Sequence, residues 1–129
     1  MNLLLETNAL LWWLAGSDRL GRPARNAIAD PDSDVYASAA SAWEIAIKVG
    51  LGKLELPANV ATWLPAQLTE NRFVPLPISI AHALGVEDLP PHHTDPFDRL
   101  LVAQALVEGM TIVTGDAQLE RYAVPVILA

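Results

Sequence analysis

A run of three leucines, Leu3 to Leu5, followed at once by Glu6, Thr7 and Asn8, is the feature that most constrains this chain. Consecutive leucines without alternation are typical of a strand buried on both faces, as at the centre of a parallel sheet. A second apolar run, from Ala9 to Leu14, follows the polar residues and is long enough for a buried helix. In open α/β sheets, ligands bind at the carboxyl ends of the strands. We therefore expect a site around the three polar residues that end this strand.

Apolar strand-like runs alternate with longer helical patterns along the rest of the chain. Such alternation predicts an α/β fold with a central parallel β-sheet flanked by helices on both faces. The prolines at 75 and 77 indicate that the third strand is short or lies at an edge. The expected strands cover residues 2–6, 34–37, 72–76, 110–113 and 124–128, and the expected helices cover residues 7–15, 23–29, 39–49, 59–68, 79–86, 95–109 and 117–122.

The composition of the 129 residues narrows the class of protein. Hydrophobic residues make up 52% of the chain, which indicates a well-buried core and argues against disorder. The formal net charge of -7 argues against a protein that coats nucleic acid, because such proteins normally present a basic face. It does not exclude a nuclease, because cations held by carboxylates attract phosphate.

The N-terminus and the cysteine count bear on the location of the protein. Without cysteine the chain forms neither a disulfide framework nor a thiolate metal site, and a reducing cytoplasm is the expected location. Met1 and Asn2 lead straight into leucines, without the basic region of a signal peptide. The polar residues that follow interrupt any membrane-spanning segment, so we expect no membrane association.

Glu44 lies in a helical stretch that is apolar on nearly all sides, residues 39–49. A carboxylate in a buried helix is costly unless it is paired or binds a metal ion. Lys48, four residues later, is well placed for an ion pair along the helix. The sequence leaves both interpretations of Glu44 open.

Asp95, Pro96 and Asp98 stand at the start of the helix expected over residues 95–109. Aspartate followed by proline is the usual chemistry of a helix N-cap and first turn, so we expect Asp95 to be a cap. Asp98 falls in the first turn, where its charge suits the helix dipole. Its side chain projects from the amino end of a buried helix, where it can face a site.

Asp116 repeats the opening pattern, because it follows an apolar strand and a hydroxyl residue, Thr114. Capping of the next short helix would explain Asp116 alone. Glu6 and Asp116 nevertheless both follow strands, while Glu44 and Asp98 stand on helices beside the sheet. Four acids at one edge repel one another unless a cation lies between them. Hard oxygen donors without Cys or His suit Mg²⁺ or Mn²⁺.

Four segments of the chain resemble the PIN-domain toxins of the VapC type, which are ribonucleases of bacterial toxin–antitoxin systems. The similarity runs from Leu3 to the last strand, and the second and third segments are its most specific parts. The four segments are Leu4–Asn8, Ser41–Lys48, Asp95–Ala105 and Val113–Asp116.

The resemblance implies a single PIN-like domain over residues 1–129 that acts as a divalent-metal-dependent endoribonuclease. It implies that four acids bind Mg²⁺ or Mn²⁺ and catalyse hydrolysis of RNA phosphodiester bonds, namely Glu6, Glu44, Asp98 and Asp116. It assigns supporting roles to Thr7, Asn8, Asp95 and Thr114. It further implies that the protein is a toxin with RNA as substrate, that a small antitoxin protein occludes the site, and that the chain forms a homodimer.

One position departs from the family pattern. The family's first acid is an aspartate, whereas Glu6 places its carboxylate one methylene further out. The alternative function is therefore a catalytically impaired PIN-like module that binds a protein partner. A phospho-receiver domain on a similar sheet fits less well, because Glu6 has no adjacent acid and the only lysines are Lys48 and Lys53.

Histidine and arginine residues receive no catalytic role. His92 and His93 precede Asp95, where contact with a substrate is one interpretation, but solvation in the loop is the one we expect. We expect His82 to lie on a helix surface. The only dense basic cluster, which we expect on a solvated helix face, consists of Arg19, Arg22 and Arg25.

Overall fold

The computed structural model describes all residues from 1 to 129 and places the leucine-rich strand at the centre of a five-stranded sheet. The strand order is β3-β2-β1-β4-β5, and every neighbouring pair is parallel. The strands are β1 (Asn2–Leu5), β2 (Asp34–Ser38), β3 (Val74–Leu76), β4 (Thr111–Thr114) and β5 (Val126–Leu128). The predicted central position of the first strand is confirmed.

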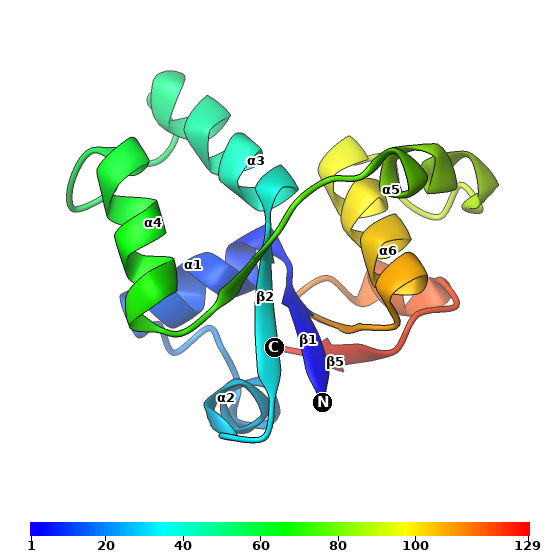
Figure 1. The fold of residues 1–129 in the computed structure, drawn as a ribbon, viewed down its shortest axis with the longest axis horizontal. Helices are drawn as coiled ribbons and strands as arrows, with labels where there is room; N and C mark the ends of the chain where they lie inside the picture. Colours follow the sequence, from blue (N-terminus) through cyan, green and yellow to red (C-terminus); the bar gives the residue numbers. More distant parts are fainter.

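Helices cover both faces of the sheet (Figure 1), with α1, α2 and α4 on one side and α5 and α6 on the other. The α-helices are α1 (Thr7–Ala15), α2 (Arg22–Ala29), α3 (Ala39–Gly50), α4 (Val60–Glu70), α5 (Ile80–Gly85) and α6 (Pro96–Glu108). Two 3₁₀ helices, η1 (Val86–Asp88) and η2 (Ala117–Arg121), complete the chain. None of the helices has both the length and the apolar character that crossing a membrane requires. The predicted α/β fold with helices on both faces is confirmed.

The side chains of β1 enter two separate cores in alternation. Leu3 and Leu5 pack with residues of α1, α2 and α4, whereas Leu4 packs with residues of α6 on the opposite face. All three leucines are completely buried, and burying each stabilises the fold by about 1.5–3 kcal/mol. Burial on both faces explains why this run is continuously apolar rather than alternating.

Local capping fixes where most helices begin and end. A side chain accepts a backbone N–H of the first turn at four of the predicted N-caps, namely Ser38, Asn59, Ser79 and Asp95. Gly109 adopts a left-handed conformation with φ of 70° and ends α6, also as predicted.

Two strands, β3 and β5, begin two residues later than predicted. β3 begins at Val74 instead of residue 72, because Arg72 has a left-handed φ of 57° that turns the chain before the strand. β5 begins at Val126 instead of residue 124, directly after Pro125, which has no N–H for a ladder. Both strands lie at the edges of the sheet.

The arginine cluster differs from the expectation. Helix α2 begins only at Arg22, so Arg19 precedes it and the three arginines do not share one helix. Arg25 is not free in solvent, because its Nη2 atom donates to the carbonyl oxygen of Ser17 at 2.7 Å.

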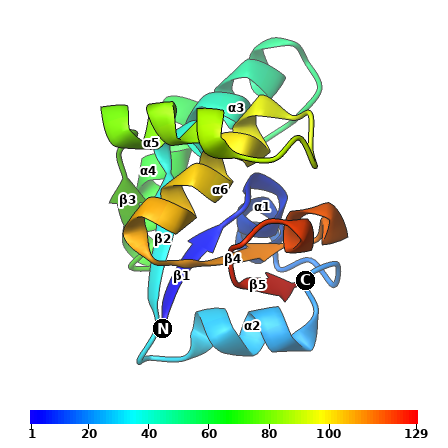
Figure 2. The same cartoon turned by 90° about the vertical axis from the view of Figure 1, so that its right-hand side faces the viewer.

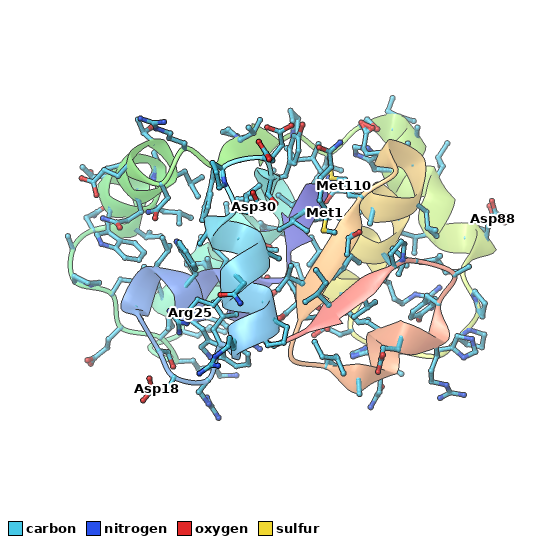
Figure 3. All side chains as sticks on the ribbon, turned by 90° about the horizontal axis from the view of Figure 1, so that it is seen from below. Met1, Asp18, Arg25, Asp30, Asp88 and Met110 are labelled. Carbon is cyan, nitrogen blue, oxygen red and sulfur yellow. The ribbon has the colours of Figure 1, made fainter.

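The carboxyl ends of β1 and β4 meet at the point where the strand order changes direction. The backbone N–H of Glu6 donates to the carbonyl of Val113 at 2.9 Å, which joins the two strand ends. Figure 2 shows β1 running towards α1 and away from the N-terminus. Figure 3 views the opposite edge, where Met1 and Met110 lie at the starts of β1 and β4. Residues that follow β1 and β4 therefore gather where open parallel sheets bind ligands.

Candidate active site

Glu6 lies at the junction of β1 and α1, where it is the N-cap of the helix. Its Oε2 accepts the backbone N–H of Asn8 at 3.1 Å, and its Oε1 accepts that of Ala9 at 3.4 Å. The residue is 6% exposed, and burial raises its pKa above the usual range even though the two backbone bonds oppose that shift. The Glu6 carboxylate is thus held against the first turn of α1.

Asp98 lies in the first turn of α6, three residues after the N-cap Asp95. Asp95 Oδ1 accepts the backbone N–H groups of Phe97 at 2.8 Å and of Asp98 at 3.2 Å, as its predicted capping role requires. Asp98 itself is 8% exposed. Burial, followed by repulsion from Glu6, raises the pKa of Asp98 to about 7.

Asp116 follows β4 and caps η2, as the capping interpretation predicted. Its Oδ1 accepts the backbone N–H of Gln118 at 2.9 Å, while Thr114 Oγ1 accepts the backbone N–H of Asp116 at 3.0 Å. A cavity of about 300 Å³ brings three of the four predicted acids together. Its lining consists of Glu6, Asn8, Trp12, Asp98, Gly115, Asp116 and Ala117.

Glu44 does not line this cavity, but its charge acts on it by raising the pKa values of Glu6 and Asp98. Its Oε2 lies 2.8 Å from Lys48 Nζ, which is the predicted ion pair. Its Oε1 is buried and has no hydrogen-bond partner. The ion-pair interpretation is therefore confirmed, and the metal-binding interpretation of Glu44 stays a prediction.

Thr7, which follows Glu6, makes a buried side-chain contact with α3. Its Oγ1 donates to Ser41 Oγ at 3.0 Å, and both residues are buried. The contact joins α1, which carries the Glu6 cap, to α3, which carries Glu44.

His93 is a site residue that the sequence analysis missed, and the expectation that it is solvated is wrong. Its Nε2 lies 2.7 Å from Asp116 Oδ2 and 3.4 Å from Asp98 Oδ2. Its position two residues before the Asp95 cap is the sequence signal that could have identified it. From this position its Nδ1 accepts the backbone N–H of Asp95 at 3.0 Å. His93, Asp98 and Asp116 each offer a possible ligand atom within 4.8 Å of the others.

The expectation for His82 is also wrong. His82 is buried, and its Nδ1 accepts the backbone N–H of Ser79 while Ser79 Oγ accepts the backbone N–H of His82. This reciprocal capping box needs a side-chain acceptor at the third helical position, which histidine supplies. His92 packs edge-on against Tyr122, with ring centroids 5.1 Å apart.

The donor set fits a hard divalent cation. Carboxylates of three residues converge on one cavity, and a fourth carboxylate nearby keeps a buried oxygen without a partner. Burial, followed by repulsion from Glu6, raises the pKa of Asp98 to about 7, so a positive charge in the cavity would favour its ionised form. Oxygen donors of this kind are those that Mg²⁺ and Mn²⁺ prefer.

Comparisons with known proteins agree with this geometry. Residues 3–125 match the family model described as the PIN domain. Ribonuclease VapC22 of Mycobacterium tuberculosis is 32% identical over 124 residues, which cover 95% of this chain and 93% of that protein. Ribonuclease VapC16 of the same organism is 40% identical over 58 residues, which cover 45% of this chain and 41% of that protein.

Two solved structures share the fold along their whole length. The VapBC2 complex of Rickettsia felis, bound to a DNA fragment from its promoter, contains a chain that aligns with a TM-score of 0.74 at 16% identity, covering 100% of this chain and 99% of that one. DNA-bound VapBC of Salmonella typhimurium contains a chain that aligns with a TM-score of 0.68 at 14% identity, covering 98% of this chain and 97% of that one. The family match and the full-length relative together show that this chain belongs to the PIN-domain family, in its VapC-type branch.

Proposed function

We propose that this chain is a divalent-metal-dependent endoribonuclease and the toxin of a toxin–antitoxin pair. The observation that carries the proposal is the convergence of Glu6, Asp98 and Asp116 on one cavity at the carboxyl edge of the sheet. The naming of a full-length relative as a ribonuclease supports RNA as the substrate.

The three acids that line the cavity would hold Mg²⁺ or Mn²⁺, and the free oxygen of Glu44 would complete the acidic set. When bound, such a cation supplies a Lewis acid for the scissile phosphate and lowers the pKa of a bound water. The sequence and the geometry favour this chemistry over nucleophilic catalysis, because the cavity lining contains no serine, cysteine or lysine.

The chain's own residues fix the acids before substrate arrives. Two backbone N–H groups orient Glu6, the Asp95 cap places Asp98 in the first turn of α6, and Thr114 holds the backbone of Asp116. Asn8 lines the cavity, where its side-chain amide offers a donor to a phosphate oxygen. Preorganised groups of this kind stabilise charge that develops in the transition state.

Arg19 gives this acidic chain a positive group beside the cavity. Its guanidinium lies 5.4 Å from the ring centroid of Trp12, and Trp12 lines the cavity. An exposed guanidinium at this place attracts the RNA backbone, and the indole beside it offers a surface for a base.

A small antitoxin is the proposed protein partner, because two structural relatives are VapBC complexes. The surface that suits it is an apolar groove of about 280 Å³ between α1 and the segment that leads into α4. Its apolar lining consists of Leu11, Leu14, Ala15, Leu54, Leu56, Pro57 and Trp63. α1 also carries Trp12 of the acidic cavity, so a partner in this groove lies close to the site.

A second copy of the chain is the proposed occupant of another apolar face. Trp43 is 59% exposed and stacks edge-on against Phe97, and Ile80 and Leu84 of α5 are also exposed. A homodimer would cover this face. Sedimentation of the purified chain should give a dimer, and Ile80→Asp should give a monomer; a monomeric wild type would contradict the proposal.

RNA cleavage by the purified chain tests the proposed activity. We expect cleavage with Mg²⁺ or Mn²⁺, loss of cleavage with EDTA, and loss in Asp98→Asn. Asp88→Asn is the matched control, because Asp88 is exposed in η1 and lies outside the cavity lining. Cleavage that survives EDTA or Asp98→Asn would contradict the mechanism. Inactivity of the wild type, restored by Glu6→Asp, would favour the impaired module.

A further inference from the structure

We propose that His93 is a positioning residue that holds the Asp116 carboxylate beside the Asp98 carboxylate. His93 Nε2 lies 2.7 Å from Asp116 Oδ2 and 3.4 Å from Asp98 Oδ2, so one ring nitrogen reaches both acids. The proposal rests on the proposed function, because it concerns how the same acids are arranged to bind a cation.

The tautomer of His93 follows from its second ring nitrogen. The backbone N–H of Asp95 donates to His93 Nδ1 at 3.0 Å, so Nδ1 carries no proton in this arrangement. The neutral ring then carries its proton on Nε2, which makes Nε2 a donor to Asp116. A metal ion on Nε2 would need the proton to move to Nδ1, which would break the bond to Asp95. The geometry therefore assigns His93 to holding a carboxylate instead of to binding the ion itself.

The loop that carries His93 is fixed on both sides. The guanidinium of Arg99 donates to the carbonyl oxygens of Val86 at 3.1 Å and Pro90 at 3.0 Å, and to the hydroxyl of Tyr122 at 3.3 Å. The His93 side chain is only 13% exposed. Its ring is therefore held against the acids and does not move freely in solvent.

Asp116 needs such a partner more than the other acids do. Its side chain is 35% exposed, and only its Oδ1 is held by the η2 backbone, which leaves Oδ2 free to turn away from Asp98. Repulsion between the two carboxylates favours that movement. The N–H of His93 opposes it, in the way that hydrogen-bond partners commonly orient carboxylates that bind metal ions.

Mn²⁺ binding to His93 variants tests the proposal. Gln carries an amide nitrogen close to the place of Nε2 and keeps a donor to Asp116, whereas Asn reaches only as far as Nδ1. We expect His93→Ala and His93→Asn to weaken Mn²⁺ affinity by about 10–100-fold, and His93→Gln to restore most of it. His92→Gln is the matched control and should bind Mn²⁺ like the wild type. Thermal unfolding of each variant checks that the fold is kept.

Two spectroscopic measurements separate positioning from direct ligation. Electron spin echo spectroscopy of bound Mn²⁺ should show no coupling to a coordinated imidazole nitrogen. Nitrogen NMR of the metal-free chain should show the His93 proton on Nε2. Imidazole coupling, a proton on Nδ1, or unchanged affinity in His93→Ala would each overturn the proposal.

Failure of the proposed function gives a different result. A folded wild type that binds no Mn²⁺ and cleaves no RNA would overturn the proposed function and the His93 proposal together. A wild type that binds Mn²⁺ and cleaves RNA, with affinity unchanged in His93→Ala, would overturn the His93 proposal alone.

Discussion

Asp98 is the residue at which stability and function conflict most. Its folded pKa of about 7 lies above the ordinary value of 3.8, so the folded chain binds more protons than the unfolded chain between these values. The contribution of Asp98 to the stability of the metal-free protein should therefore be fully present below about pH 4 and should be lost as the pH rises through 7. The loss attributable to this one group is on the order of a few kcal/mol.

Urea unfolding in EDTA between pH 4 and pH 8 measures this loss. Asp98→Asn should show a clearly shallower decline than the wild type, because its side chain does not ionise. Asp88→Asn, at an exposed position, should decline like the wild type. If the unfolding free energy of the wild type and of Asp98→Asn declined equally with pH, the raised pKa of a buried Asp98 would be refuted.

Glu6 combines a structural and a chemical role. Because Gln keeps one oxygen that accepts a backbone N–H and loses only the second such bond, Glu6→Gln should leave the unfolding free energy within about 1 kcal/mol of the wild type. It should lower the cleavage rate by roughly 100-fold, because it removes a charge from the cavity. Glu6→Asp should retain both the cap and activity. Unimpaired cleavage by Glu6→Gln would exclude a role for this carboxylate.

The sequence predicted the acids of the site better than their partners. Acidic residues after buried strands and at a helix start follow from local patterns, and the cavity contains Glu6, Asp98 and Asp116. The contacts of His93 were not predictable from the sequence. His93 and Asp116 are 23 positions apart, and their side chains meet only because of the way the loop that carries His93 folds. For Glu44 the sequence left both pairing and metal binding open. In the structure its Oε2 pairs with Lys48, and its Oε1 has no hydrogen-bond partner.

The turn between β4 and η2 depends on a close approach to α1. A Cβ at Gly115 would lie 2.7 and 2.9 Å from ring atoms of Trp12. Gly115→Ala should therefore destabilise the fold by about 1–3 kcal/mol and displace the neighbouring Asp116. Gly50→Ala is the control, because a Cβ at Gly50 would meet no neighbouring group within 4 Å, and it should be near neutral. Equal unfolding midpoints for the two variants would contradict this packing.

Elements with strong local signals were predicted well. Caps such as Ser38 and Asp95 lie next to the groups they satisfy, so sequence alone reveals them. Strand ends were predicted less well. The left-handed backbone conformation of Arg72 follows from the packing of the turn and not from the intrinsic preference of arginine. The buried state of His82 likewise depends on α5 packing against α6, which has no local signature.

At the scale of the whole molecule, the strand order brings distant acids together. β1 and β4 are neighbours although more than a hundred residues separate them in sequence. Glu6 and Asp116 therefore reach one cavity because the sheet is parallel and β1 is central. An overall charge of -7 adds to the repulsion that this gathering creates. The proposed divalent cation would offset this repulsion.

Unfolding free energy with and without Mn²⁺ at pH 8 tests this account most directly. A cation that binds only the folded cluster should stabilise the wild type by about 2.7 kcal/mol at a hundredfold excess over its dissociation constant. Asp98→Asn should lose most of that gain, while Asp88→Asn should keep it. Absence of stabilisation of the wild type by Mn²⁺, or an equal gain in Asp98→Asn, would contradict the claim that these acids gather to bind a cation.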